Sequence, residues 1–258
     1  MDMGITGRNA LVTGGSRGLG RQAALALARE KVNVAICARG EDKLAETGDE
    51  LRALGVTVKT YVADLGLPEA GDLLLKNAET DMGPIDILVN NVGGSLGTSD
   101  IINSDISDFY HVMDVNLWSS VNLMKYVLPG MTKRQWGRVI NIASIYGREH
   151  GGTAPYMTAK AAMIAVSKSA ALTVANSGVT VNAIAPGSIL FPGGTWEKFM
   201  ENNTKKDVDA FIEKNLPMGK FGWPEPIGAA VAFLASEQAS LIVGACINVD
   251  GGQSHNLF

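Results

Sequence analysis

Cysteine and histidine are scarce in this chain of 258 residues, which contains two and three of them respectively. Cys37 and Cys246 each lie in an apolar, strand-like stretch, so we expect buried free thiols and no disulfide. So few cysteines and histidines form no metal-ligand cluster, and no metal site is predicted. Reduced thiols fit a reducing compartment, which makes the cytoplasm the expected location.

Long apolar runs and strongly basic runs are also missing. No apolar stretch approaches the roughly 20 residues that a membrane-spanning helix requires. The polar segment Met1 to Arg8 contains an acid and is not expected to be a signal peptide. The formal net charge is −4, and no basic run exceeds the pairs Lys133-Arg134 and Lys205-Lys206. Neither nucleic acid nor a membrane is therefore expected as the main partner.

Apolar residues are plentiful, because 46% of the chain is hydrophobic, and strand-like runs alternate with helical ones. The predicted strands cover residues 9–13, 32–38, 56–63, 85–89, 138–143, 179–185 and 246–249. The predicted helices cover residues 21–30, 41–54, 67–82, 105–135, 156–176 and 225–236. Such alternation predicts an α/β fold of parallel βαβ units with right-handed crossovers. No repeat or linker interrupts it, so residues 1–258 are expected to form one domain.

Residues 188–226 break this rhythm, with two short helical patterns at 195–203 and 207–215. The segment is rich in aromatic residues and has alternating charges on its polar positions. We interpret it as a lid over substrate and cofactor that closes when both are bound. The alternative is a rigid surface subdomain.

A glycine-rich stretch, Gly14 to Gly20, joins the first predicted strand to the first helix. Without side chains, a pyrophosphate can approach the backbone, and the helix N-terminus supplies N–H donors and a positive dipole. The spacing is not G-x-G-x-x-G, so the usual dinucleotide fingerprint is only partly met. The alternative is a plain glycine-rich connection.

Tyr156 and Lys160 lie four residues apart in a predicted helix, with Ser144 preceding them by twelve residues. This spacing places an ammonium beside a phenol on one helix face. A charge about 4 Å away at a dielectric near 20 is worth roughly 4 kcal/mol, enough to lower the pKa of the phenol by about three units. Desolvation opposes that shift. The pair suits proton transfer, although the spacing alone also fits an ordinary tyrosine on an alanine-rich helix.

Taken in order, these motifs resemble the short-chain dehydrogenase/reductase family from about residue 7 to residue 252. The motifs are Thr13-Gly14-x-x-x-Gly18-x-Gly20, Asn90-Asn91-x-Gly93, Asn116, Ser144, the Tyr156/Lys160 pair and Pro186-Gly187. The departures are Val92, where alanine is usual, and a short interval between Ser144 and Tyr156. The resemblance implies a Rossmann-type doubly wound parallel sheet of about seven strands with helices on both faces.

The resemblance also implies four catalytic residues. Tyr156 is the general acid or base facing the substrate oxygen, and Ser144 hydrogen-bonds that oxygen. Lys160 holds the nicotinamide ribose hydroxyls and lowers the pKa of the tyrosine. Asn116 supports a water that carries protons onward from Lys160. The alternatives are that Ser144 merely ends a strand and that Asn116 caps or packs within its helix.

Cofactor contacts are implied in the same way. The expected residues are Gly14, Ser16, Arg17, Gly18, Leu19, Gly20, Arg39, Asp64, Leu65, Asn90, Gly93, Tyr156, Lys160, Pro186, Gly187 and Ile189. Asp64, Leu65, Asn90 and Gly93 would line the adenosine pocket, and the Ile189 backbone would meet the nicotinamide carboxamide. Alternatively, Asn90 holds neighbouring strands together and Asp64 caps a turn.

The end of the second predicted strand indicates which cofactor is used. NAD-binding proteins of this fold normally place an acid there for the ribose 2′-hydroxyl. Here the position is Ala38, followed by Arg39, and Arg17 in the glycine loop can approach the same phosphate. A guanidinium pairs with a 2′-phosphate, so we predict NADP(H) over NAD(H). The alternative is that both arginines are solvated surface charges.

Three functions follow from this reading. The leading one is an NADP(H)-dependent oxidoreductase that interconverts a ketone and a secondary alcohol by hydride transfer. The alternative is a 3-oxoacyl-[acyl-carrier-protein] reductase, although residues 188–194 are not typical of one and no basic patch for an acidic carrier is evident. The third, a non-catalytic dinucleotide-binding regulator, is disfavoured because Tyr156 and Lys160 are both present.

Small residues after Lys160 suggest self-association, since they allow another element to approach closely. They are Ala161, Ala162, Ala165, Ser169, Ala170 and Ala171. Related proteins pair this helix and the 105–135 helix across a two-fold axis. We therefore expect a homo-oligomer, either a dimer or a tetramer, unless the small residues serve only packing against the sheet.

Overall fold

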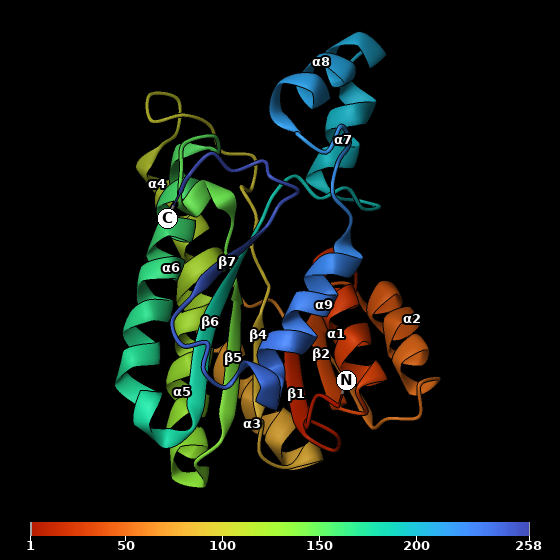
Figure 1. The fold of residues 1–258 in the computed structure, drawn as a ribbon, viewed down its shortest axis with the longest axis vertical. Coiled ribbons are helices and arrows are strands. Elements are labelled where there is room, and N and C mark those ends of the chain that lie inside the picture. Colours follow the sequence, from red (N-terminus) through yellow and green to blue (C-terminus); the bar gives the residue numbers. More distant parts are fainter. Residues whose placement is uncertain (1, 258) are drawn as a thin grey trace.

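A parallel sheet forms the centre of the protein in the computed structural model, which describes residues 2–257 (Figure 1). Its seven strands lie in the order β3-β2-β1-β4-β5-β6-β7. The strands are β1 (Asn9–Thr13), β2 (Asn33–Ala38), β3 (Val58–Val62), β4 (Ile87–Asn90), β5 (Gly137–Ile142), β6 (Val179–Pro186) and β7 (Cys246–Val249). The predicted fold class, a doubly wound Rossmann-type sheet, is confirmed.

Helices cover both faces of the sheet, because successive strand residues point to opposite sides. Ala10 and Val12 of β1 pack in one core, whereas Leu11 packs in the other. The first core is closed by α1 (Gly18–Arg29), α2 (Glu41–Arg52) and α9 (Pro224–Ala235). The second is closed by α3 (Ala70–Met82), α5 (Ser119–Arg134) and α6 (Ala154–Val174).

The strand order reverses between β1 and β4. β1 pairs with β2 on one side and with β4 on the other, so the connections leaving β1 and β4 diverge to opposite faces. In doubly wound sheets, ligands bind at such a switch point, outside the carboxyl ends of the strands. The glycine loop follows β1, and Asn91 to Gly94 follow β4. Both stretches thus lie at the expected binding edge.

The region predicted as one helix over 105–135 is not a regular α-helix. It consists of α4 (Ile106–Met113), a π-helical turn (Asp114–Trp118) and α5. Asn116 lies in the π-helical turn, where its Nδ2 donates to the Val112 carbonyl at 2.9 Å. π-Bulges inside α-helices occur frequently at functional sites. Periodicity alone did not indicate this one.

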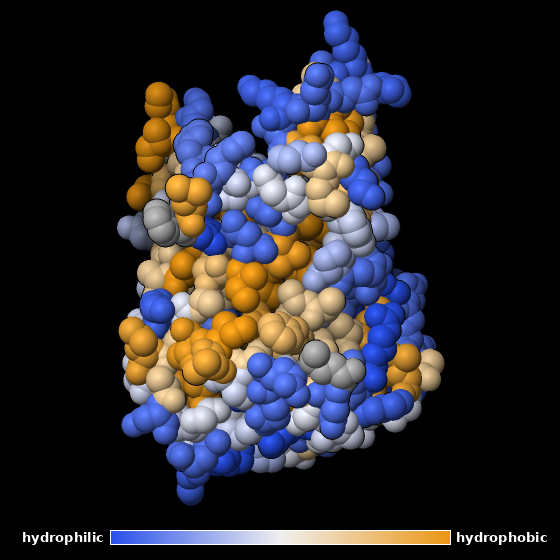
Figure 2. All heavy atoms as spheres, viewed as in Figure 1, coloured by the Kyte–Doolittle hydropathy of each residue, from blue (hydrophilic) through white to orange (hydrophobic). Residues whose placement is uncertain are grey.

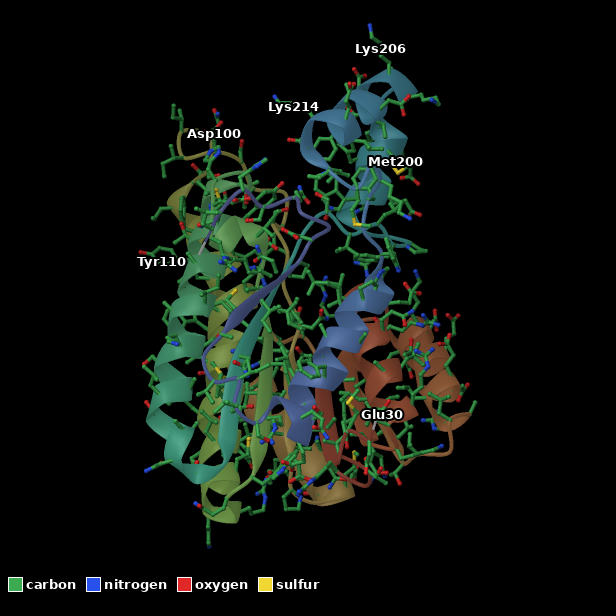
Figure 3. All side chains as sticks on the ribbon, viewed as in Figure 1. Glu30, Asp100, Tyr110, Met200, Lys206 and Lys214 are labelled. Atoms are coloured by element: carbon green, nitrogen blue, oxygen red, sulfur yellow. The ribbon has the colours of Figure 1, made fainter. Side chains whose placement is uncertain are left out.

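The 188–226 segment stands above the sheet as a separate group of helices, α7 (Thr195–Asn202) and α8 (Lys205–Asn215) (Figure 1). Most of its aromatic residues pack against one another in a small core of their own. That core contains Leu190, Trp196, Phe199, Val208, Phe211, Ile212, Leu216 and Phe221. Met200, Lys206 and Lys214 project from the outside of these helices (Figure 3). Closure of this segment over ligands stays a prediction, which protease sensitivity with and without ligands would test.

Three expectations about absent features can be compared with the structure. Within residues 2–257, no helix combines the length and apolar composition needed to cross a membrane. The same residues contain no group of three or more His, Cys, Asp or Glu that could hold a metal ion. Both cysteines are free thiols, although the expected burial holds for only one of them. Cys37 is buried and Cys246 is half-buried.

A buried chain of polar side chains crosses the second core next to the switch point. Asn90 Nδ2 donates to Asn141 Oδ1 at 2.8 Å, and Asn141 Nδ2 donates to Ser167 Oγ at 2.7 Å. The Ser167 hydroxyl in turn donates to the Met163 carbonyl at 2.6 Å. The chain therefore ties β4 and β5 to α6, the helix that carries Tyr156 and Lys160.

We predict that Asn141→Ala lowers the free energy of unfolding by about 2–3 kcal/mol, because it leaves Asn90 Nδ2 buried without an acceptor. Urea unfolding checks this. Asn203→Ala is the matched control, since the exposed Asn203 amide donates only to the Phe199 carbonyl. The free energy of unfolding of Asn203→Ala should stay within about 0.5 kcal/mol of the wild-type value. Equal losses in the two variants would contradict a special role for the buried chain.

Candidate active site

The glycine loop brings backbone atoms close together at the start of α1. Gly14 and Gly18 have φ values of +64° and +54°, which favour glycine. A Cβ on Gly20 would lie 2.3 Å from the Gly14 carbonyl oxygen, so no side chain fits there. No side chain caps α1 at Arg17, and the N–H groups of its first turn face the loop end. The loop therefore has the form of an anion-binding cradle.

Asn91 links this loop to the end of β4. Its Nδ2 donates to the carbonyls of Thr13 at 2.9 Å and Gly14 at 3.2 Å. In return, Thr13 Oγ1 accepts from the backbone N–H groups of Asn91 at 2.8 Å and Val92 at 3.1 Å. Sequence reasoning placed Asn91 in a motif without assigning it a contact. Its position directly after β4 was the available signal.

Asn116 and Lys160 meet at Gly93. A Cβ on Gly93 would lie 2.5 Å from Asn116 Oδ1 and 2.9 Å from Lys160 Nζ, so both side chains occupy the space that glycine leaves. The Asn116 amide also holds Gly94, accepting from its N–H and donating to its carbonyl, each at 2.9 Å. The π-helical turn thereby fixes the loop after β4 beside Lys160.

Ser144 and Tyr156 come together from two elements. Ser144 follows β5 and begins a short 3-10 turn, in which its Oγ accepts from the Tyr146 N–H at 3.1 Å. Tyr156 lies in the first turn of α6, three residues after the capping position Thr153. A hydrogen bond joins the two side chains, and it opposes the rise in the pKa of Tyr156 that burial causes. The predicted Ser–Tyr pair is thus assembled.

The pKa of Tyr156 is not lowered overall in this structure, contrary to the prediction made from its spacing to Lys160. The pKa of Tyr156 is raised, with burial as the largest cause. Lys160 Nζ lies 5.6 Å from the centre of the tyrosine ring and donates to the Ile142 carbonyl at 2.9 Å. Burial lowers the pKa of Lys160 itself to about 8. Desolvation outweighs the charge effect expected from the spacing.

The residues expected at the adenosine end differ in their surroundings. Asp64 Oδ1 accepts from the Gly66 N–H at 3.0 Å, which is the turn-capping contact stated as its alternative. Leu65 is buried in the second core. Asn90 Oδ1 is buried without a partner among residues 2–257. Ser16 and Leu19 are half-buried in the glycine loop and at the start of α1.

Arg17 and Arg39 are both exposed, but their contacts differ. Arg17 Nη1 donates to the Gly193 carbonyl at 2.7 Å, so it joins the glycine loop to the 188–226 segment. The phenyl ring of Phe191 covers the other side of this joint, because a Cβ on Gly18 would lie 2.6 Å from it. Arg39 forms no hydrogen bond or ion pair with the residues that the structure describes, which leaves its guanidinium available to a ligand.

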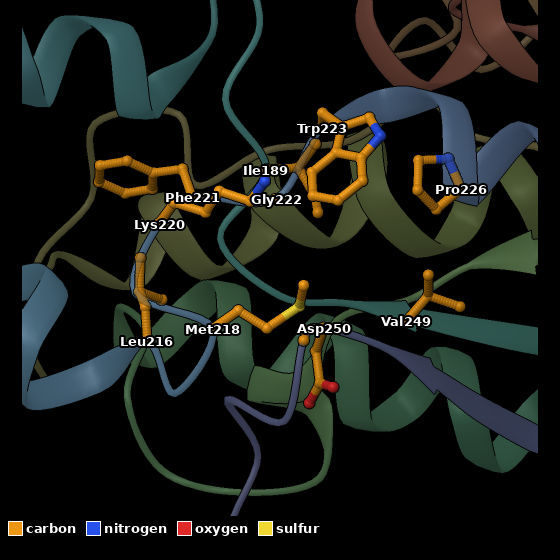
Figure 4. A pocket seen from close by; sticks show the side chains of 11 residues that line it. Ile189, Leu216, Met218, Lys220, Phe221, Gly222, Trp223, Pro226, Val249 and Asp250 are labelled. Carbon is orange, nitrogen blue, oxygen red and sulfur yellow. The ribbon is translucent and has the colours of Figure 1, made fainter.

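Pro186, Gly187 and Ile189 lie at the carboxyl end of β6. The Gly187 N–H donates to the Val249 carbonyl at 3.3 Å, which continues the pairing with β7. Ile189 is buried and forms a bridge to Gly222. A pocket of about 110 Å³ lies behind it, with Trp223 beside Ile189 and Met218 toward Asp250 (Figure 4). None of the four predicted catalytic residues lines that pocket.

Taken together, the residues at this edge can accommodate a dinucleotide. The glycine loop brings backbone atoms to where a pyrophosphate would lie, and the missing side chain of Gly93 lets Asn116 and Lys160 approach the loop after β4. The buried ammonium and the serine–tyrosine pair lie at the ends of β4, β5 and the start of α6. A hydride carrier in the cradle would therefore end near a proton donor. Such an arrangement can reduce a carbonyl or oxidise an alcohol.

Sequence comparison gives the same picture over nearly the whole chain. A family model described as Enoyl-(Acyl carrier protein) reductase matches residues 14–254. The 3-oxoacyl-[acyl-carrier-protein] reductase FabG of Escherichia coli (strain K12) is 37% identical over 251 residues. That match covers 97% of this chain and 98% of the relative.

Solved structures are similar at comparable identity. L-sorbose reductase from Gluconobacter frateurii, complexed with NADPH and L-sorbose, has a TM-score of 0.92 and 31% identity, with 100% of both chains covered. A 3-oxoacyl (acyl-carrier-protein) reductase from Agrobacterium tumefaciens C58 with NADP bound has a TM-score of 0.90 and 31% identity. That comparison covers 97% of this chain and 96% of the other.

The lowered pKa of Lys160 predicts how stability depends on pH. Its pKa is about 8 in the folded protein, whereas an unfolded lysine titrates near 10.4. Between these values the unfolded chain binds more protons, so the free energy of unfolding rises with pH. We expect a gain of up to about 3 kcal/mol between pH ~8 and ~10.4 in the ligand-free protein, which Lys160→Met should lack.

Urea unfolding across this pH range measures the difference between wild type and variant. Lys168→Met serves as the control, because Lys168 lies on the same helix but is exposed. Its pH profile should follow that of the wild type. A Lys160→Met profile parallel to the wild type would show that the lysine is not titrating in this window.

Proposed function

This chain belongs to the short-chain dehydrogenase/reductase family, and we propose that it is an NADP(H)-dependent oxidoreductase that interconverts a ketone and a secondary alcohol. The observation that carries the proposal is the meeting of Ser144, Tyr156 and Lys160 beside the glycine loop. Ser144 follows β5, Tyr156 and Lys160 lie in α6, and the cradle is the loop between β1 and α1. These elements are far apart in the sequence and meet only at the carboxyl edge of the folded sheet.

In the reductive direction, Tyr156 donates its hydroxyl proton to the carbonyl oxygen. The cofactor, when bound, supplies the hydride that adds to the carbonyl carbon. Proton and hydride together convert the ketone to the alcohol, and the reverse steps oxidise it. Ser144 Oγ hydrogen-bonds the same oxygen and stabilises the negative charge that develops there.

Lys160 acts as the charged partner of this proton donor. Its ammonium would bind the ribose hydroxyls of the cofactor, and its lowered pKa places its own proton exchange near neutral pH. Asn116 holds the Gly94 loop against Lys160, and its support of a proton-carrying water remains part of the proposal.

NADP(H) is the proposed cofactor. Arg39 follows β2 at the position where an acid would select NAD(H), and its guanidinium has no partner among residues 2–257. The similar structures from Gluconobacter frateurii and Agrobacterium tumefaciens contain NADPH and NADP respectively. Arg17 would have to exchange its contact with Gly193 for a phosphate contact.

Two substrate classes have support. The L-sorbose reductase structure favours a small polyhydroxylated ketone. The FabG relatives favour a 3-oxoacyl thioester. The 188–226 segment places most of its aromatic residues in its own core, which leaves fewer of them to line a channel for an acyl chain. Rates with L-sorbose, simple ketones and acetoacetyl-coenzyme A, each with NADPH, separate the classes.

We predict that Tyr156→Phe reduces the turnover number at least about a hundredfold, because it removes the proton donor and little else. NADPH affinity, measured by fluorescence titration, should stay within about threefold, which corresponds to less than ~1 kcal/mol. Tyr110→Phe is the control, since Tyr110 is 67% exposed on α4. Near-normal turnover in Tyr156→Phe would refute the catalytic assignment.

We predict that Arg39→Asp weakens NADPH binding at least about tenfold and narrows or reverses the preference over NADH, because a carboxylate repels the 2′-phosphate. The ratio of kcat/KM for the two cofactors measures the preference. Lys76→Asp makes the same charge change on the exposed face of α3 and should leave the ratio unaltered. Equal efficiency of the wild type with both cofactors would contradict the proposed role.

We further propose that the chain forms a dimer or tetramer. Exposed apolar side chains on α4 to α6, including Trp118 and Leu172, support pairing through that face. Apolar residues also gather over β7 and α9 (Figure 2), where β7 is an edge strand and Phe233 is 38% exposed. Light scattering at micromolar concentration decides the matter, and a monomer would contradict the proposal.

A further inference from the structure

The last residues of the chain fold back across the carboxyl edge of the sheet. We call residues 250–256 the C-terminal strap; it runs from the end of β7 toward α4 and α6 (Figure 1). Gly251 and Gly252 turn the chain with φ values of +65° and +79°. The Asp250 carboxylate closes the turn by accepting from the N–H groups of Gly252 at 3.0 Å and Ser254 at 2.8 Å. The strap is therefore a defined turn.

The side-chain amide of Gln253 forms two hydrogen bonds with Ser188. The Ser188 N–H donates to Gln253 Oε1 at 2.7 Å, and Gln253 Nε2 donates to Ser188 Oγ at 2.9 Å. A backbone N–H can only donate, which fixes the orientation of the amide. Gln253 is 6% exposed and Ser188 is 3% exposed, so water does not compete for these bonds. We call this pair of hydrogen bonds the Gln253–Ser188 clamp.

The strap approaches the backbone before Ser188 equally closely. A Cβ on Gly187 would lie 2.7 Å from Gln253 Oε1 and 2.8 Å from Asp250 Cβ. The absence of a side chain at Gly187 therefore lets the strap pack against the segment between β6 and Ile189. Any displacement of Gln253 would free the backbone immediately before the residue proposed to meet the nicotinamide carboxamide.

The clamp also orients the Ser188 hydroxyl. Since Ser188 Oγ accepts from Gln253, its hydrogen is left to donate, and Ser188 forms a side-chain hydrogen bond with Tyr146. The Tyr146 ring lies against the loop between Ser144 and Tyr156, because a Cβ on Gly151 would lie 2.3 Å from it. Through Tyr146, the clamp therefore connects the residues after β6 to the loop between Ser144 and Tyr156.

Glu149 anchors the far end of the strap. One oxygen of its carboxylate, Oε2, accepts from Ser254 Oγ at 3.0 Å, the His255 N–H at 3.0 Å and the Asn256 N–H at 3.1 Å. Asn256 Nδ2 donates to the Arg148 carbonyl at 2.7 Å. The loop after Ser144 and the end of β6 are thus held together by the same short segment.

We propose that Gln253 is a positioning residue for the nicotinamide end of the cofactor. It holds Ser188, and through it the backbone of Ile189, in the arrangement that receives the carboxamide. The inference rests on the proposed function, because it assumes that a nicotinamide cofactor binds at this edge. Gln253 acts through Ser188 and not on the substrate itself. Nothing in the sequence indicated this, since the two residues are 65 positions apart.

The test compares two ligands that differ only at the nicotinamide end. NADPH carries a reduced nicotinamide on its second ribose, whereas 2′-phospho-ADP-ribose keeps the adenosine, 2′-phosphate, pyrophosphate and second ribose and lacks only the nicotinamide. Gln253→Met keeps the length of the side chain and removes both hydrogen bonds. We expect it to weaken NADPH binding roughly tenfold and to change 2′-phospho-ADP-ribose binding less than about twofold.

Two further variants complete the design. Ser188→Ala removes the hydroxyl but keeps the N–H bond to Gln253, so its effect should have the same selectivity at a smaller size. Ser254→Ala is the matched control, because Ser254 belongs to the strap but bonds Glu149 and not Ser188. Its ratio of the two affinities should equal that of the wild type. Dissociation constants come from calorimetric titration, and circular dichroism checks that each variant is folded.

Equal weakening of both ligands by Gln253→Met, or no weakening of either, would overturn the proposal. If Gln253→Met does not fold, the affinity ratio of Ser188→Ala decides: a selective loss of NADPH supports the clamp, and an unchanged ratio refutes it. A wild type that binds NADPH but reduces no carbonyl would refute the proposed function, while the affinity ratio would still decide on Gln253. A wild type that does not bind NADPH would refute both.

Discussion

The close approach of backbone segments at the carboxyl ends of β1 and β4 is the constraint on which the rest of the site depends. Gly20 lies so near the Gly14 carbonyl that no side chain fits between them, and the Asn91 amide bridges the same carbonyl to β4. These contacts set the start of α1 and the course of the loop through Gly93. A bound dinucleotide would rest on backbone atoms whose positions are already fixed.

Desolvation, more than charge pairing, sets the pKa values of Tyr156 and Lys160, the residues proposed to act in catalysis. Lys160 is 3% exposed and donates to a carbonyl, and burial lowers its pKa to about 8. Burial also raises the pKa of Tyr156, against the effect of its hydrogen bond with Ser144. In the ligand-free protein the phenol thus keeps its proton at neutral pH, which suits the reductive direction. Asn116 adds rigidity by joining the π-helical turn to the loop after β4.

The sequence was sufficient to predict the features that depend on local pattern. Alternating strands and helices predicted the sheet, and the glycine spacing with the Tyr156/Lys160 pair predicted the candidate residues that meet at its carboxyl edge. Contacts between distant residues were not predictable, because no local signal encodes them. The Arg17–Gly193 bond, the Gln253–Ser188 clamp and the Lys160–Ile142 bond all belong to this class. The π-helical turn at Asn116 was also missed, since its apolar period differs little from that of an α-helix.

The central claim is that this protein transfers hydride between NADPH and a carbonyl carbon. Incubation of the wild type with NADPH carrying deuterium on one or the other face of C4 tests it directly, with L-sorbose, simple ketones and acetoacetyl-coenzyme A as acceptors. We predict that one of the two labelled cofactors places deuterium on the carbinol carbon of a product, detected by mass spectrometry and NMR. Products without deuterium from either cofactor, or no product with any acceptor, would contradict the claim.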